Sequence, residues 1–313
     1  MNEQLIVSVS PHIRVKEDTR SVMRDVIIAL LPAMAAAVYL FGWYSLVLTG
    51  ISIISCLLTE FIFQRLLKRK SSIGDYSAVV TGILLSFMLP PTVPWWIAAV
   101  GAIVAILLGK QIFGGLGYNP FNPALVGRAI LLASWPVYMT TWVRPFDAVT
   151  SASPLGIVKM GLDQPLPGYL DLFLGNRAGC LGETSVIALL LGGIYLLYRR
   201  QISWHVPLVY IGTVAVMSII FKKDPLFNIL AGGLILGAFF MATDMVTTPL
   251  TRNGKLIFGA GCGFLTALIR FYGGFPEGVC YAILIMNMFT PWIDRYTMPR
   301  RFGTRNKKIK NKK

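Results

Sequence analysis

Hydrophobic residues fall in long runs along this chain, and polar residues gather between the runs. A helix needs roughly 20 mostly apolar residues to cross the hydrocarbon core of a bilayer, and on this rule the runs predict about ten membrane helices. The first five are expected at residues 26–43, 45–63, 77–89, 95–113 and 123–135. The other five are expected at residues 185–198, 206–221, 226–243, 256–271 and 279–293. The pattern therefore predicts an all-α integral membrane protein.

Several of these predicted helices are too short to cross a bilayer. The runs at 77–89 and 123–135 hold 13 residues each. Non-helical backbone is tolerated at membrane depth only where protein or a water-filled cavity surrounds it. The short runs are therefore expected to be broken or re-entrant helices buried inside the protein.

The chain is also predicted to contain an internal repeat. A glycine-containing apolar stretch followed by a proline-containing turn occurs at residues 81–94 and again at 232–250, and a Gly-Gly pair follows an aromatic residue at 113–115 and at 272–274. Corresponding glycines are 151 residues apart in the first case and 159 in the second. Each half would hold five helices, an odd number, so the second half would be inverted relative to the first. Inverted repeats place binding sites near the midplane of the bilayer.

Charged residues add an orientation to this picture. The chain is 55% hydrophobic and 14% charged, and its net charge is +15. With the N-terminus inside, 22 of the 29 Lys and Arg residues fall on the inner face, Lys110 among them, and 6 fall on the outer face, including Arg177 and Arg270. This asymmetry predicts that both termini lie in the cytoplasm. It also argues against a nucleic-acid partner, and the basic tail is expected to touch anionic membrane lipid.

Five regions follow from these patterns. They are a cytoplasmic segment (1–25), a first membrane repeat (26–135), an extracytoplasmic loop (136–183), a second membrane repeat (184–294) and a basic cytoplasmic tail (295–313).

The extracytoplasmic loop contains a run of hydroxyl side chains at residues 147–153, Asp-Ala-Val-Thr-Ser-Ala-Ser. Ser and Thr often bond to their own backbone in turns, so one interpretation is that these residues only shape the loop. The segment also resembles the flavinylation motif of the RnfD/NqrB family, Asp-x-x-Ser/Thr-x-Ala-Ser/Thr. The last hydroxyl of that motif carries FMN through a phosphoester. The family most often has Thr at the last position and often Gly before the Ala, where this chain has Ser153 and Ser151.

This resemblance implies a covalent FMN on Ser153, placed outside the cytoplasm, where the FMN transferase of the family works. The remaining motif residues are then expected to surround the flavin: Asp147, Thr150, Ser151 and Ala152.

A second segment, residues 114–123, combines glycines with two Asn-Pro pairs. It lacks the third glycine of a dinucleotide fingerprint, and no strand precedes it. Glycine allows close backbone approach and proline forces a turn, which is typical of a re-entrant segment. The run is similar to the Gly-Gly-x-Gly-x-Asn-x-x-Asn-Pro-Ala segment of the same family. With residues 10–12 and 242–249, the resemblance covers essentially the whole chain, and the short N-terminus favours the RnfD branch. The residues expected to contact a cofactor here are Gly114, Gly115, Asn119, Asn122 and Arg128.

Three charged residues lie in or near the predicted helices: Glu60, Arg128 and Asp244. A charge at membrane depth is costly unless it is paired or faces water, so each is a functional candidate. Glu60 is expected to lie near the interface and to snorkel. For Arg128 two roles remain open, a phosphate contact or a pair with an acid such as Asp244, and Asp244 is the candidate for an ion pathway. The four cysteines form no C-x-x-C pair, so no metal site is predicted.

The resemblance implies a component of an Rnf-type complex in the bacterial cytoplasmic membrane, which couples electron flow between ferredoxin and NAD to Na⁺ or H⁺ movement. The expected partners are the A, B, C, E and G subunits and an FMN transferase, and a second, noncovalent riboflavin between the helices is left open. Because the chain has no iron–sulfur or dinucleotide motif, it is not expected to be catalytically complete alone.

A transporter or channel for a small polar solute is the alternative, since inverted repeats with re-entrant segments suit that function as well. A membrane scaffold without a cofactor is a third interpretation.

Overall fold

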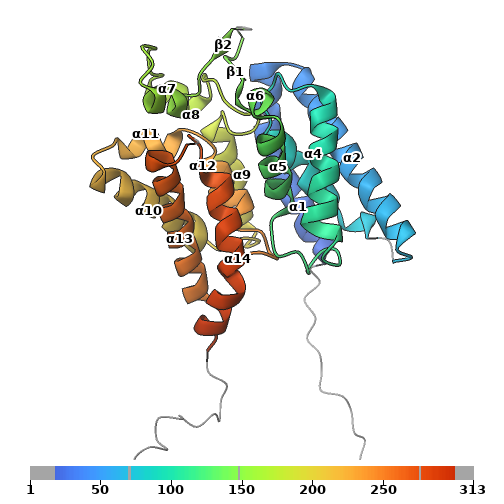
Figure 1. The fold of residues 1–313 in the computed structure, drawn as a ribbon. Coiled ribbons are helices and arrows are strands. Elements are labelled where there is room, and N and C mark those ends of the chain that lie inside the picture. The colour runs from blue at the N-terminus through green and yellow to red at the C-terminus, as the bar shows by residue number, and fades with distance from the viewer. Residues whose placement is uncertain (1–17, 70–71, 147–148, 275, 300–313) are drawn as a thin grey trace, which may run out of the picture.

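A computed structural model describes residues 18–69, 72–146, 149–274 and 276–299, and its elements are almost all helices (Figure 1). The first half contains α1 (Thr19–Phe41), α2 (Tyr44–Leu66), the short 3-10 helix η1 (Ile73–Asp75), α3 (Ser77–Phe87), α4 (Trp95–Ile106), the π-helical turn η2 (Leu107–Gln111) and α5 (Pro123–Ser134). The second half contains α9 (Val186–Tyr198), α10 (His205–Ile220), α11 (Pro225–Leu230), α12 (Leu234–Leu236), the π-helical turn η3 (Gly237–Met241), α13 (Arg252–Tyr272) and α14 (Val279–Thr297). The connection between the halves contains α6 (Pro136–Thr140), the paired strands β1 (Trp142–Val143) and β2 (Thr150–Ser151), α7 (Pro154–Met160) and α8 (Tyr169–Leu174).

The prediction of an all-α membrane protein is confirmed, but a count of ten full crossings is not. In the described part of the chain, α1, α2 and α13 are long and apolar enough to cross a membrane. Other apolar helices, including α3 and α5, are shorter. The protein thus combines full-length helices with the short ones expected from the sequence.

One predicted helix, 226–243, is wrong as a continuous element. The structure divides it into α11, α12 and η3, with a break at residues 231–233 where Gly232 has a φ of +70°. Hydrophobicity continues across the break, so the apolar run alone could not reveal it. The break leaves backbone carbonyl groups without helical partners inside the protein.

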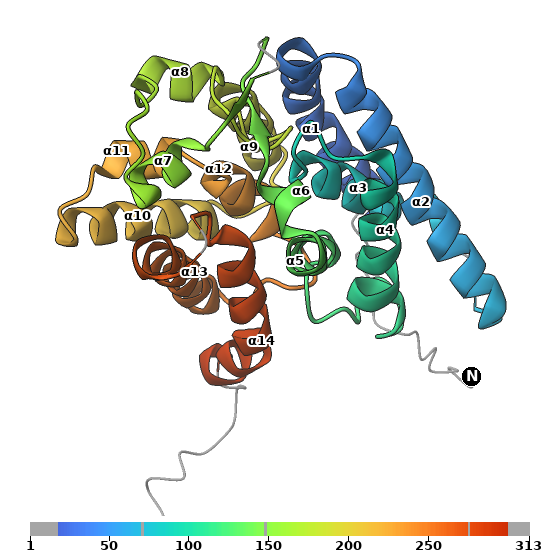
Figure 2. The same cartoon turned by 45° about the horizontal axis from the view of Figure 1, so that its top comes forward.

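The two halves pair their helices in the same way, which supports the predicted duplication. In the first half α2 packs against α3 and α4, and in the second α10 packs against α11 and α13. Likewise α4 packs along α5 as α13 packs along α14. The halves meet where α1 crosses α9 and where α5 contacts α14, and Figure 2 shows α5 between α4 and α14. Both of these contacts join corresponding helices. The inversion of the second half stays a prediction.

The connection between the halves lies at one end of the molecule. In Figure 1, β1, β2, α6, α7 and α8 lie at the top, whereas α1 begins and α14 ends at the bottom. We call these ends the outer and inner ends. This placement agrees with the predicted loop lying opposite both termini, although the tail at 307–313 and the motif at 10–12 are outside the described residues.

Close packing between α1 and α9 gives a first prediction. A Cβ on Gly192 of α9 would lie 1.9 Å from the carbonyl oxygen of Ala29 in α1. Small residues let membrane helices approach closely, and overpacking typically costs about 1–3 kcal/mol. Gly192→Ala should therefore lower the Tm of the detergent-purified protein by several degrees. Gly212→Ala in α10 is the control, because its Cβ would meet nothing within 4 Å. Equal Tm values for the two variants would contradict the packing argument.

Candidate functional site

The hydroxyl of Ser153 caps a short helix at the outer end. Strands β1 and β2 pair Trp142 with Ser151, and the chain then turns into α7, which has Pro154 at its first position. The Oγ atom of Ser153 accepts a hydrogen bond from the backbone N–H of Gly156 at 3.2 Å, and Ser153 is 6% exposed. Ser before Pro is a favoured start of a helix. The turn-forming role is thus realised at Ser153. Its oxygen accepts the capping bond, so the hydroxyl proton is not used in it.

The other motif residues lie around the same turn. Thr150 is exposed, Ser151 and Ala152 are half-buried, and Asp147 lies outside the described residues. Ser151 and Ala152 line a cleft of about 310 Å³ together with Arg144, Asn176 and Arg177. This volume is at the lower end of the range for small-molecule sites.

The cleft residues can hold an anionic group. Arg144 is exposed at the wall of the cleft. Among the described residues, no hydrogen-bond acceptor contacts the Nε of the buried Arg177. Two guanidinium groups in a cleft that Ser151 also lines form a donor set suited to a phosphate group. The cleft next to the predicted motif therefore fits an FMN phosphate.

The connection between the halves, residues 136–183, is called the outer segment below. Two polar contacts at the protein surface hold it to the second half. In α7, the Nζ of Lys159 donates to the backbone oxygen of Arg270 at 3.2 Å. In α8, the hydroxyl of Tyr169 donates to the Asp224 carboxylate, and this bond holds the pKa of Asp224 below its ordinary value. Both contacts add to apolar anchoring, since Leu155 of α7 and Leu172 of α8 belong to the hydrophobic core.

Arg128 of α5 pairs with an acid, which is one of the two roles left open for it, and the acid is Glu277 rather than the example Asp244. Its guanidinium donates to the Glu277 carboxylate and to the backbone oxygen of Met88, and it lies 3.2 Å from the Sγ of Cys180. The pair joins the first half to the turn before α14. The sequence analysis did not select Glu277, because the turn that contains it was taken for a loop. The Gly-Gly pair that precedes this turn, which matches the pair at Gly114, was the signal that could have found it.

Two further arginines are buried at the break after α11, although their predicted place was the outer surface. The NH1 of Arg177 donates to the backbone oxygen of Leu230 at 2.7 Å, and the NH1 of Arg270 donates to that of Asn228 at 2.6 Å. The NH2 of Arg270 also donates to Ala231 at 3.2 Å. Both side chains are directed inward because they satisfy carbonyl groups that the interrupted helix leaves unpaired.

Cys180, Glu183 and Glu277 form the one group of potential metal ligands found among the described residues, with donor atoms within 4.8 Å of one another. Arg128 contacts two of these three side chains. The positive charge of this guanidinium, in contact with the group, disfavours a metal cation there. Cys180, for which the sequence suggested no partner, contacts Arg128 and the backbone oxygen of Met88, the latter at 3.0 Å.

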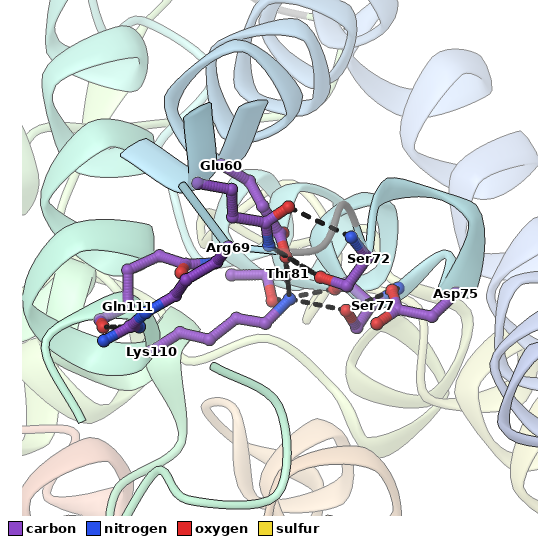
Figure 3. Close-up of polar contacts among 9 residues, drawn as sticks. Glu60, Arg69, Ser72, Asp75, Ser77, Thr81, Lys110 and Gln111 are labelled. Atoms are coloured by element: carbon purple, nitrogen blue, oxygen red, sulfur yellow. Dashed lines mark hydrogen bonds and ion pairs between the residues drawn. The ribbon is translucent and has the colours of Figure 1, made fainter. Parts of the chain in front are cut away.

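A second buried charge cluster lies at the inner end, around Glu60 and Lys110 (Figure 3). The Nζ of Lys110 lies 2.8 and 2.9 Å from the two carboxylate oxygens of Glu60. Glu60 is 0% exposed and Lys110 is 1% exposed. The expectation that Glu60 snorkels is therefore wrong. Lys110, which was counted on the inner face, does lie at the inner end, but its side chain is buried. The two residues are 50 positions apart, and only the packing of η2 against α2 brings them together.

Polar side chains complete this cluster. The Oε1 of Glu60 accepts from the Oγ of Ser72 at 2.7 Å and from the Nε2 of Gln64 at 3.0 Å. The Nζ of Lys110 also donates to the Oγ of Ser77 at 2.6 Å, and that hydroxyl donates to Asp75 at 2.5 Å. Such bonds are needed because desolvation of a buried ion pair costs several kcal/mol per ion.

Glycines 114 and 115 have φ values of +123° and +104°, so both occupy the turn expected for this segment. A Cβ on Gly115 would meet no protein atom within 4 Å, so packing within the protein does not require glycine there. Both glycines line a cavity of about 610 Å³ at the inner end, which we call the inner vestibule; its other walls include Gln64, Arg69, Ser72 and Gln111.

The remaining candidates share a smaller cavity of about 40 Å³, which we call the inner pocket. It is lined by Asn119, Asn122 and Asp244 and also by Lys110. The Oδ1 of Asn122 accepts from the backbone N–H of Ala124 at 3.1 Å and caps α5. Asp244 accepts from the Oγ1 of Thr247 at 3.2 Å. The structure thus unites these candidates at the inner end and places Ser153 at the outer end.

The fold and the two charge clusters define a polytopic α-helical membrane protein with two similar halves and polar sites at interrupted helices. The model of the NQR2, RnfD, RnfE family matches residues 6–303, so the chain belongs to this family. This finding confirms the resemblance seen in the sequence.

Relatives with described roles align along nearly the full chain. The D subunit of the Na⁺-translocating ferredoxin:NAD⁺ oxidoreductase complex of Acetobacterium woodii is 51% identical over 308 residues, 97% of each chain. The D subunit of the proton-translocating ferredoxin:NAD⁺ oxidoreductase complex of Clostridium ljungdahlii is 48% identical over 318 residues, 96% of each chain. The D subunit of the ion-translocating oxidoreductase complex of Halorhodospira halophila is 39% identical over 335 residues, 94% of each chain.

The Arg128–Glu277 pair gives a second prediction. Arg128→Met leaves the half-buried Glu277 carboxylate without this cation. Breaking a fully buried pair typically costs about 3–5 kcal/mol, so a loss toward the lower end of that range is expected. The variant should show a strongly reduced Tm and yield, and adding Glu277→Gln should restore part of the loss. Arg144→Met, which removes an exposed arginine, is the matched control and should keep the wild-type Tm. A normal Tm for Arg128→Met would contradict the structural role of the pair.

Proposed function

We propose that this chain is the D subunit of an Rnf-type complex that couples electron transfer between ferredoxin and NAD to ion translocation. The names and the full-length alignment of the relatives support this role. In this role it is a membrane component of an oxidoreductase, and it works only with companion subunits of the A, B, C, E and G types.

The protein carries FMN esterified to Ser153 and attached by an FMN transferase. The observation that carries this part of the proposal is that the two chain neighbours of Ser153, Ala152 and Pro154, line a cleft together with Arg144 and Arg177. Arg144, Asn176 and Arg177 would hold the phosphate group, and Ser151 and Ala152 would border the ring. When bound, the flavin supplies the electron-transfer chemistry, while the protein supplies its position and electrostatic surroundings.

A noncovalent riboflavin would occupy the inner vestibule. The volume of about 610 Å³ and the wall made by Gly114 and Gly115 support this assignment. The side-chain amide of Gln111 is buried, and in the described part of the structure it has no hydrogen-bond partner. An amide offers both a donor and an acceptor, which complements the polar edge of a heteroaromatic ring.

Attachment at Ser153 gives the third prediction. Ser153→Ala removes the ester oxygen, so a denaturing gel of the membrane fraction should show no flavin fluorescence at the mass of this protein. Ser153→Thr keeps a hydroxyl and should keep the fluorescent band. Thr150→Ala is the matched control in the same turn and should also keep it. A fluorescent band in the Ser153→Ala variant would refute the assignment, and its loss in Thr150→Ala alone would move the attachment to Thr150.

The fourth prediction concerns orientation in the bacterial cytoplasmic membrane. The outer segment should face away from the cytoplasm and the end of α9 toward it, following the distribution of Lys and Arg. Val149 and Tyr198 are exposed at the two ends and suit single-cysteine labelling in a cysteine-free background. An impermeant maleimide added to intact cells should label position 149 and not 198. The opposite result would place Ser153 on the cytoplasmic side and contradict the proposed attachment.

A further inference from the structure

Cationic side chains of the outer face gather around two cavities. Of the six Lys and Arg residues that the sequence places on this face, Arg144 and Arg177 line the cleft next to the flavin motif. Three others, Lys159, Lys223 and Arg270, line a second cavity of about 360 Å³, which we call the lateral cavity. Membrane proteins carry few Lys and Arg residues on the outer face, so three cations around one cavity indicate a specific role for them.

The lateral cavity lies between α7, α11 and the end of α13. Figures 1 and 2 show α7 next to α11 near the outer end, and Lys159 of α7 donates to the backbone oxygen of Arg270 in α13. Much of the wall is apolar and is formed by Leu155, Val158, Leu166, Phe227 and Phe271. The volume suits the polar part of a small ligand. The cavity thus combines cations with an apolar wall.

The positive charge of the cavity exceeds its negative charge. Three cations face one acid, Asp224, so the formal net charge of the lining is +2. The Asp224 carboxylate already accepts from the hydroxyl of Tyr169 and from the backbone N–H of Leu226. Arg270 is 5% exposed, and its two terminal nitrogens donate to neutral backbone oxygens. Its Nε has no acceptor among the described residues, so this buried cation can still bind an anionic oxygen.

An aromatic cluster borders the cavity on the side of the membrane helices. The ring of Phe271 lies 5.3 Å from that of Phe221 at the end of α10, and the ring of Tyr272 lies 5.5 Å from Phe221. Aromatic residues are enriched where the hydrocarbon meets the lipid headgroups. Phe264, Leu268 and Tyr272 are exposed and follow one another at four-residue spacing, so they form an apolar stripe along α13. The stripe ends beside the cavity, at the depth expected for headgroups.

We propose that the lateral cavity binds an anionic phospholipid such as phosphatidylglycerol. Lys159, Lys223 and Arg270 hold the phosphate, and the acyl chains lie along the stripe on α13. A phosphate diester carries one negative charge and offers oxygens to both ammonium and guanidinium groups. A zwitterionic lipid has the same phosphate, but its own ammonium group would face the lysines of the cavity.

The bound lipid would join α7 to the end of α13. The segment that contains Ser153 would then be held in part by the membrane itself. The site rests on the geometry of the cavity and not on the proposed function, whereas its assignment to the outer leaflet rests on the predicted orientation.

The fifth prediction compares two neighbouring lysines. Lys222 and Lys223 are both exposed, but of the two only Lys223 lines the cavity. Native mass spectrometry of the purified full-length protein, titrated with phosphatidylglycerol in detergent micelles, should show one saturable lipid. Lys223→Gln should weaken its binding about fivefold, as expected for the loss of one cation at a membrane surface. Lys222→Gln is the matched control and should bind as the wild type does.

Further measurements separate lipid binding from a structural role and from other ligands. Without lipid, Lys223→Gln should keep the wild-type Tm, because this side chain is exposed. Phosphatidylcholine with the same acyl chains should bind more weakly than phosphatidylglycerol, and inorganic phosphate should not displace the bound lipid. The double variant Lys159→Gln/Lys223→Gln should bind phosphatidylglycerol more weakly than Lys223→Gln does.

Several outcomes would overturn the site. Equal phosphatidylglycerol binding by the wild type and by Lys223→Gln would do so, and so would an equal loss in Lys222→Gln. Equal affinity for phosphatidylcholine would show that the cations do not select the lipid. Displacement by inorganic phosphate at low millimolar concentration would show a site for free anions instead. The flavin band of Lys223→Gln should stay at the wild-type level, so this test and that of the proposed function can fail independently.

Discussion

Backbone carbonyl groups at interrupted helices impose the strictest constraint on this protein. Inside a membrane protein, water is not available to bond to carbonyls that a helix leaves unpaired. At the end of α11, these carbonyl groups accept hydrogen bonds from Arg177 and Arg270. After α3, the backbone oxygen of Met88 accepts a hydrogen bond from Arg128. Each guanidinium presents several donors in a rigid fork, which suits it to this task better than a lysine. The buried arginines are therefore a consequence of the helix breaks.

This constraint also places the outer segment. Its last part runs into the core, where the backbone N–H groups of Leu181 and Gly182 donate to the oxygens of Leu89 and Phe87 at 3.0 and 2.9 Å. The segment that contains Ser153 is thus attached to both interrupted helices and is not a free loop. A cofactor attached at Ser153 would be held at a fixed position relative to the buried charges, which electron transfer between fixed carriers requires.

Helix α5 connects the two ends of the molecule. Its cap, Asn122, lines the inner pocket. Arg128, six residues later, contacts Cys180 and Glu277 near the outer end. Six residues of helix span about 9 Å, and the side chains of α5 between them, such as Leu125, belong to the apolar core. The inner and outer polar sites are therefore close along α5 but separated by apolar packing. A movement of α5 would affect both sites, because both the Arg128–Glu277 pair and the inner pocket depend on it.

The sequence by itself determined the features that depend on local composition. Apolar runs determined the helical membrane class, the Ser-Pro pair at Ser153 determined a helix cap, and Gly114 and Gly115 determined a turn with positive φ. Tertiary structure alone decided which charges meet: Glu60 with Lys110, Arg128 with Glu277, and Arg177 and Arg270 with the end of α11. The hydrophobic pattern does not reveal the helix break at Gly232, because the run stays apolar across it. The partner of a buried charge depends on which residues lie close in three dimensions, which the sequence does not show. For that reason the sequence could count Lys110, Arg177 and Arg270 only by membrane face and place Glu60 near the interface, whereas packing buries all four.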